Sequence, residues 1–165
     1  LQKKLGDGYQ VKNFGVSART MMNKGDLPYM NELAWRDAQA FNPNIVIVKL
    51  GTNDSKTHNW AHGADEFRQS MQAMIDTLKA LPSKPKIYLC SPIPAFKDTW
   101  TICDSVIVNG EMPIIKKLAK KNKCQFIDLH TSYTYGDMML NDGIHPNAKG
   151  AAKMADIIFD AIEKK

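Results

Sequence analysis

Apolar residues follow two alternating patterns along the chain. Short apolar runs bounded by turn residues predict strands at residues 9–14, 45–50, 86–90 and 125–129. Apolar residues three and four apart predict helices at residues 31–41, 65–81 and 104–121, and a last helix that starts after Asn147. Strands alternating with helices predict an α/β fold with three layers, α/β/α, in which a parallel sheet forms the middle layer.

Two local signals refine this prediction. Pro113 should kink the helix at residues 104–121 or mark a late start, because proline lacks an N–H and clashes with the preceding turn. Residues 1–5 resemble the last turns of a helix that Gly6 caps. Such a helix normally crosses over from an earlier strand of a parallel sheet. We therefore expect one domain, residues 1–165, that lacks its first strand and is truncated at its amino end.

Composition and charge exclude several classes of protein. The fractions of hydrophobic residues, 44%, and charged residues, 24%, are those of a globular domain. The longest apolar run, residues 45–48, is too short to span a membrane. The net charge of +5 owes much to one lysine cluster, which is typical of a solvated helix face: Lys116, Lys117, Lys120, Lys121 and Lys123. Nucleic-acid binding is the less favoured interpretation, so we expect neither nucleic acid nor membrane as a partner.

Polar residues and glycines that could take part in catalysis or binding follow the predicted strands. Gly15 follows the first and Gly51-Thr52-Asn53-Asp54 the second, at the sheet edge where such folds bind ligands. Asp142 and His145 lie three positions apart in a loop before the last helix. An imidazole can take a proton from a nucleophile while a carboxylate orients it. The Asn53 amide and the Gly15 N–H could stabilise an oxyanion, although each residue could also simply form a turn.

These residues resemble the motifs of a known superfamily. Asn13-Phe14-Gly15-Val16-Ser17, Gly51-Thr52-Asn53-Asp54 and Asp142-Gly143-Ile144-His145-Pro146 are similar, in order and placement, to motifs of the SGNH hydrolases, the GDSL-like lipases and acylhydrolases. The resemblance implies a flavodoxin-like SGNH fold, with Gly15 and Asn53 as oxyanion donors, His145 as general base and Asp142 as its orienting carboxylate.

The nucleophile of that superfamily is absent from the sequence. Its Gly-Asp-Ser motif ends the first strand, and its expected position falls upstream of Leu1; Ala18 also replaces a glycine common in the second motif. Ser17 is the alternative, since Gly15-Val16-Ser17-Ala18-Arg19 half resembles a nucleophile elbow. Enzymes with that elbow usually separate the Asp and His widely in sequence, which disfavours Ser17. Three other serines near strand ends lack an activating context: Ser55, Ser91 and Ser132.

Metal and cofactor chemistry is not indicated. His58 and His62 have the spacing of a zinc helix, but no Glu follows the first of them. Together with Trp60 they are expected to form a loop over the mouth of the pocket or simply an exposed loop. Three cysteines are odd in number and widely spaced, which gives neither a disulfide framework nor a metal site: Cys90, Cys103 and Cys124. Ester hydrolysis by Ser, His and Asp needs only water, so we expect no cofactor.

The substrate is inferred from resemblance. Residues 96–111 and 127–131 are similar to bacterial sialate or xylan acetylesterases, which implies an acetyl ester on a carbohydrate and a periplasmic or extracellular location. Aromatic residues in the loop at residues 92–101 suit stacking on sugar rings. The alternative is a non-catalytic carbohydrate-binding domain on the same fold. The residues upstream of Leu1 discriminate between the two, because only the enzyme needs a serine there.

Overall fold

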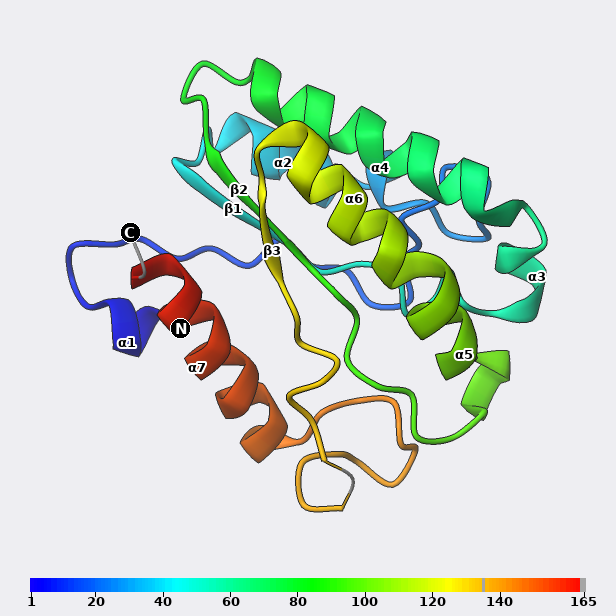
Figure 1. Ribbon diagram of the computed structural model, residues 1–165. Coiled ribbons are helices and arrows are strands. Elements are labelled where there is room, and N and C mark those ends of the chain that lie inside the picture. Colours follow the sequence, from blue (N-terminus) through cyan, green and yellow to red (C-terminus); the bar gives the residue numbers. More distant parts are fainter. Residues whose placement is uncertain (135, 164–165) are drawn as a thin grey trace.

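The computed structural model describes residues 1–134 and 136–163 and has a parallel sheet at its centre (Figure 1). Its three strands are β1 (Ile45–Val48), β2 (Lys86–Cys90) and β3 (Gln125–Ile127), paired in that order. Val48 lies opposite Leu89, and Cys90 lies opposite Ile127. The prediction of an α/β fold with a parallel sheet is therefore confirmed.

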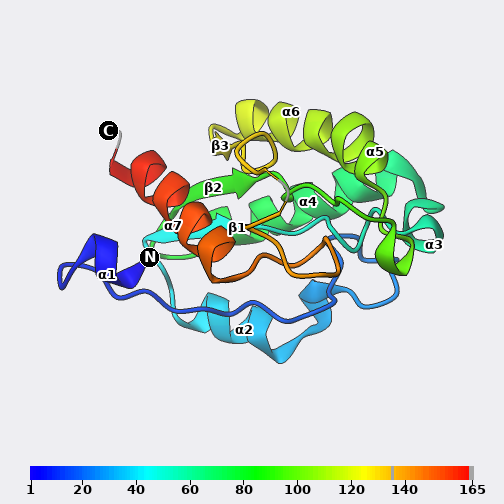
Figure 2. The same cartoon turned by 90° about the horizontal axis from the view of Figure 1, so that it is seen from below.

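Alternation along the strands builds a core on each face of the sheet. Val46 and Val48 pack into a cluster with residues of α2 (Leu33–Ala40), α4 (Gly63–Ala80) and α6 (Met112–Asn122). Ile45 and Ile47 pack into a second cluster with residues of α7 (Ala148–Glu163) and α1 (Gln2–Leu5). Successive strand residues point to opposite faces, so an apolar strand is covered twice. Figure 2 shows α6 beside β3 and α2 beyond β1.

Local signals explain several helix ends. Asn147 caps α7, because its Oδ1 accepts hydrogen bonds from the N–H groups of Lys149, at 2.9 Å, and Gly150, at 3.1 Å. The helix predicted at residues 104–121 consists of α5 (Asp104–Val106), a π-helical turn (Ile107–Glu111) and α6. Pro113 has no N–H to donate, and the wider turn lies directly ahead of it. The remaining elements are α3 (Thr57–Trp60) and 3₁₀ turns at Tyr29–Asn31 and Thr99–Thr101.

The strand predicted at residues 9–14 is wrong. Among the described residues this segment has no ladder partner; its backbone instead bonds to the Gln2 side chain, at Tyr9 O (2.9 Å) and Val11 N (2.7 Å). A strand exists only when a neighbour pairs with its backbone. A groove of about 750 Å³, here called the β1 groove, has its walls formed by this segment and by β1. Among the described residues, β1 pairs with β2 alone, so its other edge is open to this groove.

Candidate active site

The loop at residues 142–145 holds its carboxylate and imidazole in direct contact. His145 Nδ1 lies 3.0 Å from Asp142 Oδ2, and Asp142 Oδ1 accepts the N–H groups of Ile144 and His145, each at 2.8 Å. The main-chain N–H of His145 is the largest influence on the pKa of Asp142 and lowers it. Burial opposes this effect, but the N–H of Ile144 and the His145 ring add to it, so the pKa lies below its usual value. The ionised carboxylate fixes the proton on Nδ1 and leaves Nε2 free to accept one.

A neighbouring loop braces this pair. Thr99 Oγ1 donates to Asp142 O at 2.8 Å, and Lys97 Nζ donates to Asn141 O at 2.7 Å. The Trp100 ring lies against the imidazole of His145, with centroids 5.7 Å apart and planes at 71°. Trp100 is 56% exposed and has a left-handed backbone, φ 56°. A bulky residue held in this conformation is strained, a feature that clusters at functional sites.

The turn after β1 presents Asn53. Gly51 O accepts the N–H of Asp54 at 2.8 Å, and Gly51 has φ +131°, a conformation that favours glycine. Asn53 Nδ2 donates one hydrogen to Arg19 O at 3.2 Å. A side-chain amide carries two N–H donors, so one remains for a ligand.

Asp54 ties this turn to the segment before α2. Its fully buried carboxylate accepts the N–H groups of Met21, at 2.8 Å, and Met22, at 2.7 Å. Burial raises the pKa of Asp54 to about 7, although these hydrogen bonds favour the charged form. The two segments that bracket the site are therefore fixed to each other at Asp54.

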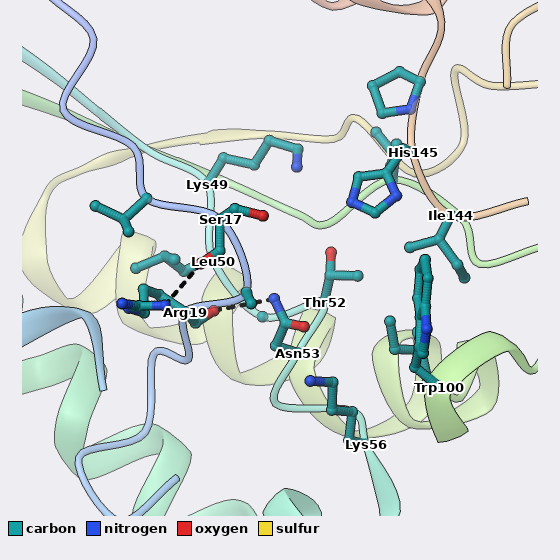
Figure 3. Close-up of a pocket in the computed structure, with 16 residues that line it drawn as sticks. Ser17, Arg19, Lys49, Leu50, Thr52, Asn53, Lys56, Trp100, Ile144 and His145 are labelled. Atoms are coloured by element: carbon teal, nitrogen blue, oxygen red, sulfur yellow. Dashed lines mark hydrogen bonds between the residues drawn. The ribbon is translucent and has the colours of Figure 1, made fainter. Parts of the chain in front are cut away.

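One pocket of about 470 Å³ brings the two halves together (Figure 3). The His145 ring and the Asn53 side chain reach it from opposite sides, with Thr52 between them. Ser17 and Trp100 also line it, and so do three cations: Arg19, Lys49 and Lys56. Asn53 and His145, predicted from separate motifs, thus share one pocket.

Gly15 is placed differently. Its N–H donates to Asn13 Oδ1 at 2.9 Å, and the residue lines the β1 groove rather than the pocket of Asn53 and His145. The Gly15 N–H could bind an oxyanion only after the exposed Asn13 side chain had released it. Gly15 as an oxyanion donor stays a prediction.

The serines divide into two groups. Ser17 is exposed and lines the pocket, but among the described residues no hydrogen bond joins it to His145. Ser55 Oγ donates to Thr52 O at 2.8 Å and so stabilises the turn after β1. Ser91 Oγ accepts the N–H of Leu129 at 2.9 Å and so links the segments that follow β2 and β3. Ser132 Oγ donates to Asp128 O at 3.2 Å.

The segment with His58 and Trp60 does not cover the pocket, which corrects the prediction. His58 Nε2 contacts Asp26 Oδ2 at 3.0 Å, and Trp60 packs against Phe67 with ring centroids 5.9 Å apart. Trp60 therefore packs against the core beside α4 and not over the pocket. His130 Nε2 contacts Asp104 Oδ1 at 3.0 Å. Within residues 1–134 and 136–163, no group of three or more His, Cys, Asp or Glu residues is arranged to hold a metal.

The geometry suits acyl transfer. When a nucleophile adds to a carbonyl group, an imidazole with its orienting carboxylate can take the proton of the nucleophile, and an amide donor on the opposite wall can stabilise the negative charge on the carbonyl oxygen. The model of the GDSL-like lipase/acylhydrolase family matches residues 1–153. The chain belongs to this family. The family is one of carboxylic ester hydrolases, as the motifs predicted.

Relatives and solved structures agree with this membership. The chain is 54% identical to an acetylxylan esterase of Xylanibacter ruminicola over an alignment 181 positions long, which covers 99% of the chain and 38% of the relative. The chain thus spans about two fifths of that relative. A carbohydrate acetylesterase from Sinorhizobium meliloti, Est24, superposes with a TM-score of 0.79 at 23% identity, over 98% of this chain and 81% of the other.

A second solved structure, an acetyl xylan esterase, superposes with a TM-score of 0.68 at 25% identity, over 90% of this chain and 78% of the other. These superpositions confirm the SGNH fold. Across the described residues no helix is both long and apolar enough to cross a membrane.

Sequence reasoning missed two residues near the site. Glu111 is fully buried in the π-helical turn, although it was assigned no role. Its spacing of four from Ile107 and Ile115 places it on the apolar side of the helix, which is a detectable signal. Trp100 was counted only among loop aromatics. Its contact with His145 joins segments 45 residues apart, so no local pattern predicts it.

Proposed function

We propose that this protein is a serine esterase that removes a small acyl group, acetyl in the first instance, from a carbohydrate. The observation that carries the proposal is the shared pocket of the Asp142–His145 pair and Asn53. The acetylxylan esterase relative, at 54% identity, supports the substrate class.

The proposed chemistry follows from the atoms that face the pocket. Asp142 keeps the proton of His145 on Nδ1, so Nε2 accepts the hydroxyl proton of the nucleophile as the hydroxyl oxygen attacks the ester carbonyl. The free N–H of Asn53 binds the oxyanion, and the Gly15 N–H becomes a second donor once Asn13 releases it. The imidazolium then protonates the leaving alcohol. Water, activated by the same imidazole, cleaves the acyl-enzyme and releases the acid.

The nucleophile is the serine of a strand that enters the β1 groove from a segment outside this chain. Support comes from the open edge of β1 and from apolar groove walls that include Trp35, Val46 and Val48. A parallel strand beside β1 would end at the same sheet edge as Asn53, next to the pocket. It would also pair with backbone groups of β1 that have no ladder partner among the described residues.

Active-site labelling tests the nucleophile. The longer polypeptide that contains this chain is treated with a fluorophosphonate, and the modified peptide is mapped by mass spectrometry. The proposal predicts a label on a serine outside residues 1–165, which is lost in His145→Ala. A label on Ser17 would instead support the alternative nucleophile. The absence of both label and turnover would support a carbohydrate-binding domain without catalysis.

A further inference from the structure

Glu111 presents an unusual arrangement directly beneath the turn that carries Asn53. The residue is fully buried at the end of the π-helical turn, and within the described residues neither carboxyl oxygen has a hydrogen-bond partner. Buried polar groups nearly always find partners, so an exception of this kind needs an explanation. π-helical turns are themselves frequent at functional sites.

The carboxyl group lies against the main chain of Gly51. A Cβ built on Gly51 would meet Glu111 Oε2 at 2.4 Å and Pro92 Cγ at 2.8 Å. Glu111 therefore occupies the space that a side chain at position 51 would need. Gly51 is followed by Thr52 and Asn53, which both line the pocket.

The other supports of this turn hold different atoms. Asn59 Nδ2 donates to Asn53 O at 2.8 Å, and Asp54 binds the N–H groups of Met21 and Met22. These contacts fix the far end of the turn, while Glu111 contacts its start. Among the described residues, the side-chain amide of Asn53 makes one hydrogen bond, to Arg19 O at 3.2 Å, so its direction depends on the main chain beneath it.

We propose that Glu111 is a positioning residue, which braces Gly51 from below and thereby sets the direction of the Asn53 amide. The inference rests on the proposed function, because it assigns Asn53 the oxyanion. Glu111 touches no substrate and acts only through the turn.

The brace works as a neutral acid. Burial, and then the charge of Asp54, raise the pKa of Glu111 well above its ordinary value. Asp54 is the charged group that acts on it; its other close neighbours, Gly51 and Pro92, carry no charge. A carboxylate formed here would be unpaired and would repel Asp54. The uncharged amide of Gln has nearly the same shape and should replace it.

Three variants of the longer, active polypeptide test the proposal with p-nitrophenyl acetate. We expect Glu111→Ala to lower kcat about tenfold or more, with KM within about threefold, because the loss falls on a transition-state contact. Glu111→Gln should keep kcat within about threefold of the parent and should remove any loss of kcat at alkaline pH that ionisation of Glu111 causes. Ile115→Ala, equally buried one turn further along α6, is the control for stability.

The control separates positioning from folding. Ile115→Ala should lower the melting temperature at least as much as Glu111→Ala while leaving kcat within about twofold, because it lies in the core and not under the turn. An unchanged kcat in Glu111→Ala, or equal losses of kcat in both variants, would overturn the proposal.

A spectroscopic readout keeps the inference independent of turnover. In a ¹H–¹⁵N spectrum, the side-chain NH₂ resonances of Asn53 should move in Glu111→Ala but not in Ile115→Ala. If the Asn53 side-chain chemical shifts do not change in Glu111→Ala, the role of Glu111 is overturned whatever the activity. If these shifts change in Glu111→Ala but the parent protein has no esterase activity, the positioning role of Glu111 is upheld and the proposed function is rejected.

Discussion

Asp142 holds His145 twice, through its ring and through its backbone. One carboxyl oxygen lies 3.0 Å from Nδ1, and the other accepts the main-chain N–H of His145 at 2.8 Å. The three-residue spacing brings the carboxylate onto the imidazole within one loop, and Thr99 and Trp100 of a neighbouring loop brace the pair. The spacing predicted that Asp142 orients the His145 imidazole, and the contact between Oδ2 and Nδ1 gives this prediction a physical basis.

Asp142→Asn should leave the fold intact and nearly abolish turnover. An Asn amide can donate to Nδ1, which moves the ring proton to Nε2 and removes the acceptor that the nucleophile needs. We expect kcat to fall by about 10³–10⁴. Asp137→Asn is the control, because Asp137 pairs with Lys149 at the surface. Steady-state kinetics that show similar turnover in both variants would contradict the role of Asp142.

Asn53→Ala should lower kcat by about 10²–10³ with little change in KM, because an oxyanion donor acts mainly in the transition state. The side chain makes one hydrogen bond, at 3.2 Å, so the melting temperature should change little. A loss confined to KM, measured over a range of substrate concentrations, would assign Asn53 to ground-state binding instead.

Trp100→Ala should lower kcat/KM for acetylated xylo-oligosaccharides about tenfold more than it lowers kcat/KM for ethyl acetate, since only a sugar ring can stack on the indole. Loss of the contact with the His145 ring should affect both esters alike. In Figure 3 the Trp100 side chain borders the pocket next to Ile144. Leu33→Ala is the control, because Leu33 is 66% exposed on α2 and is found in the lining of neither the pocket nor the β1 groove. Equal losses on both esters would refute a sugar platform.

Asp54 should make stability depend on pH. Its pKa in the folded state, about 7, lies above the ordinary value of 3.8. Between these two values the folded state binds more protons than the unfolded state, so stability falls as pH rises, by at most about 1.4 kcal/mol per pH unit from this group. The stability advantage of the parent over Asp54→Asn should therefore shrink from pH 4.5 to 6.5 in urea unfolding. A constant or growing advantage would contradict the raised pKa.

The sequence alone predicted most of the layers, because strand and helix periodicities are local. It failed at residues 9–14, where the apolar and polar pattern fits a strand but no neighbouring strand pairs with it. It also misplaced Trp60, because whether an aromatic side chain faces a pocket or a core depends on helices far away in sequence. Periodicity describes an element, and pairing partners decide whether that element forms.

The candidate site shows the same division. Asp142 and His145 were predicted as a pair because one short loop contains both. Asn53 and His145 are 92 residues apart in sequence, and only the crossovers of the sheet bring them to one pocket. The brace from Glu111 to Gly51 could not be predicted from local signals, because it crosses between a helix and a strand end.

The role of His145 is tested most directly by the acetyl-ester turnover of His145→Ala in a polypeptide that also includes the proposed nucleophile strand. We expect kcat to fall by about 10⁴ or more, because His145 is the one imidazole among the described residues that line the pocket and Asp142 orients it. An unchanged melting temperature would show that the fold survives. Turnover equal to that of the parent would contradict the assignment of His145 as the general base, and with it the proposed mechanism.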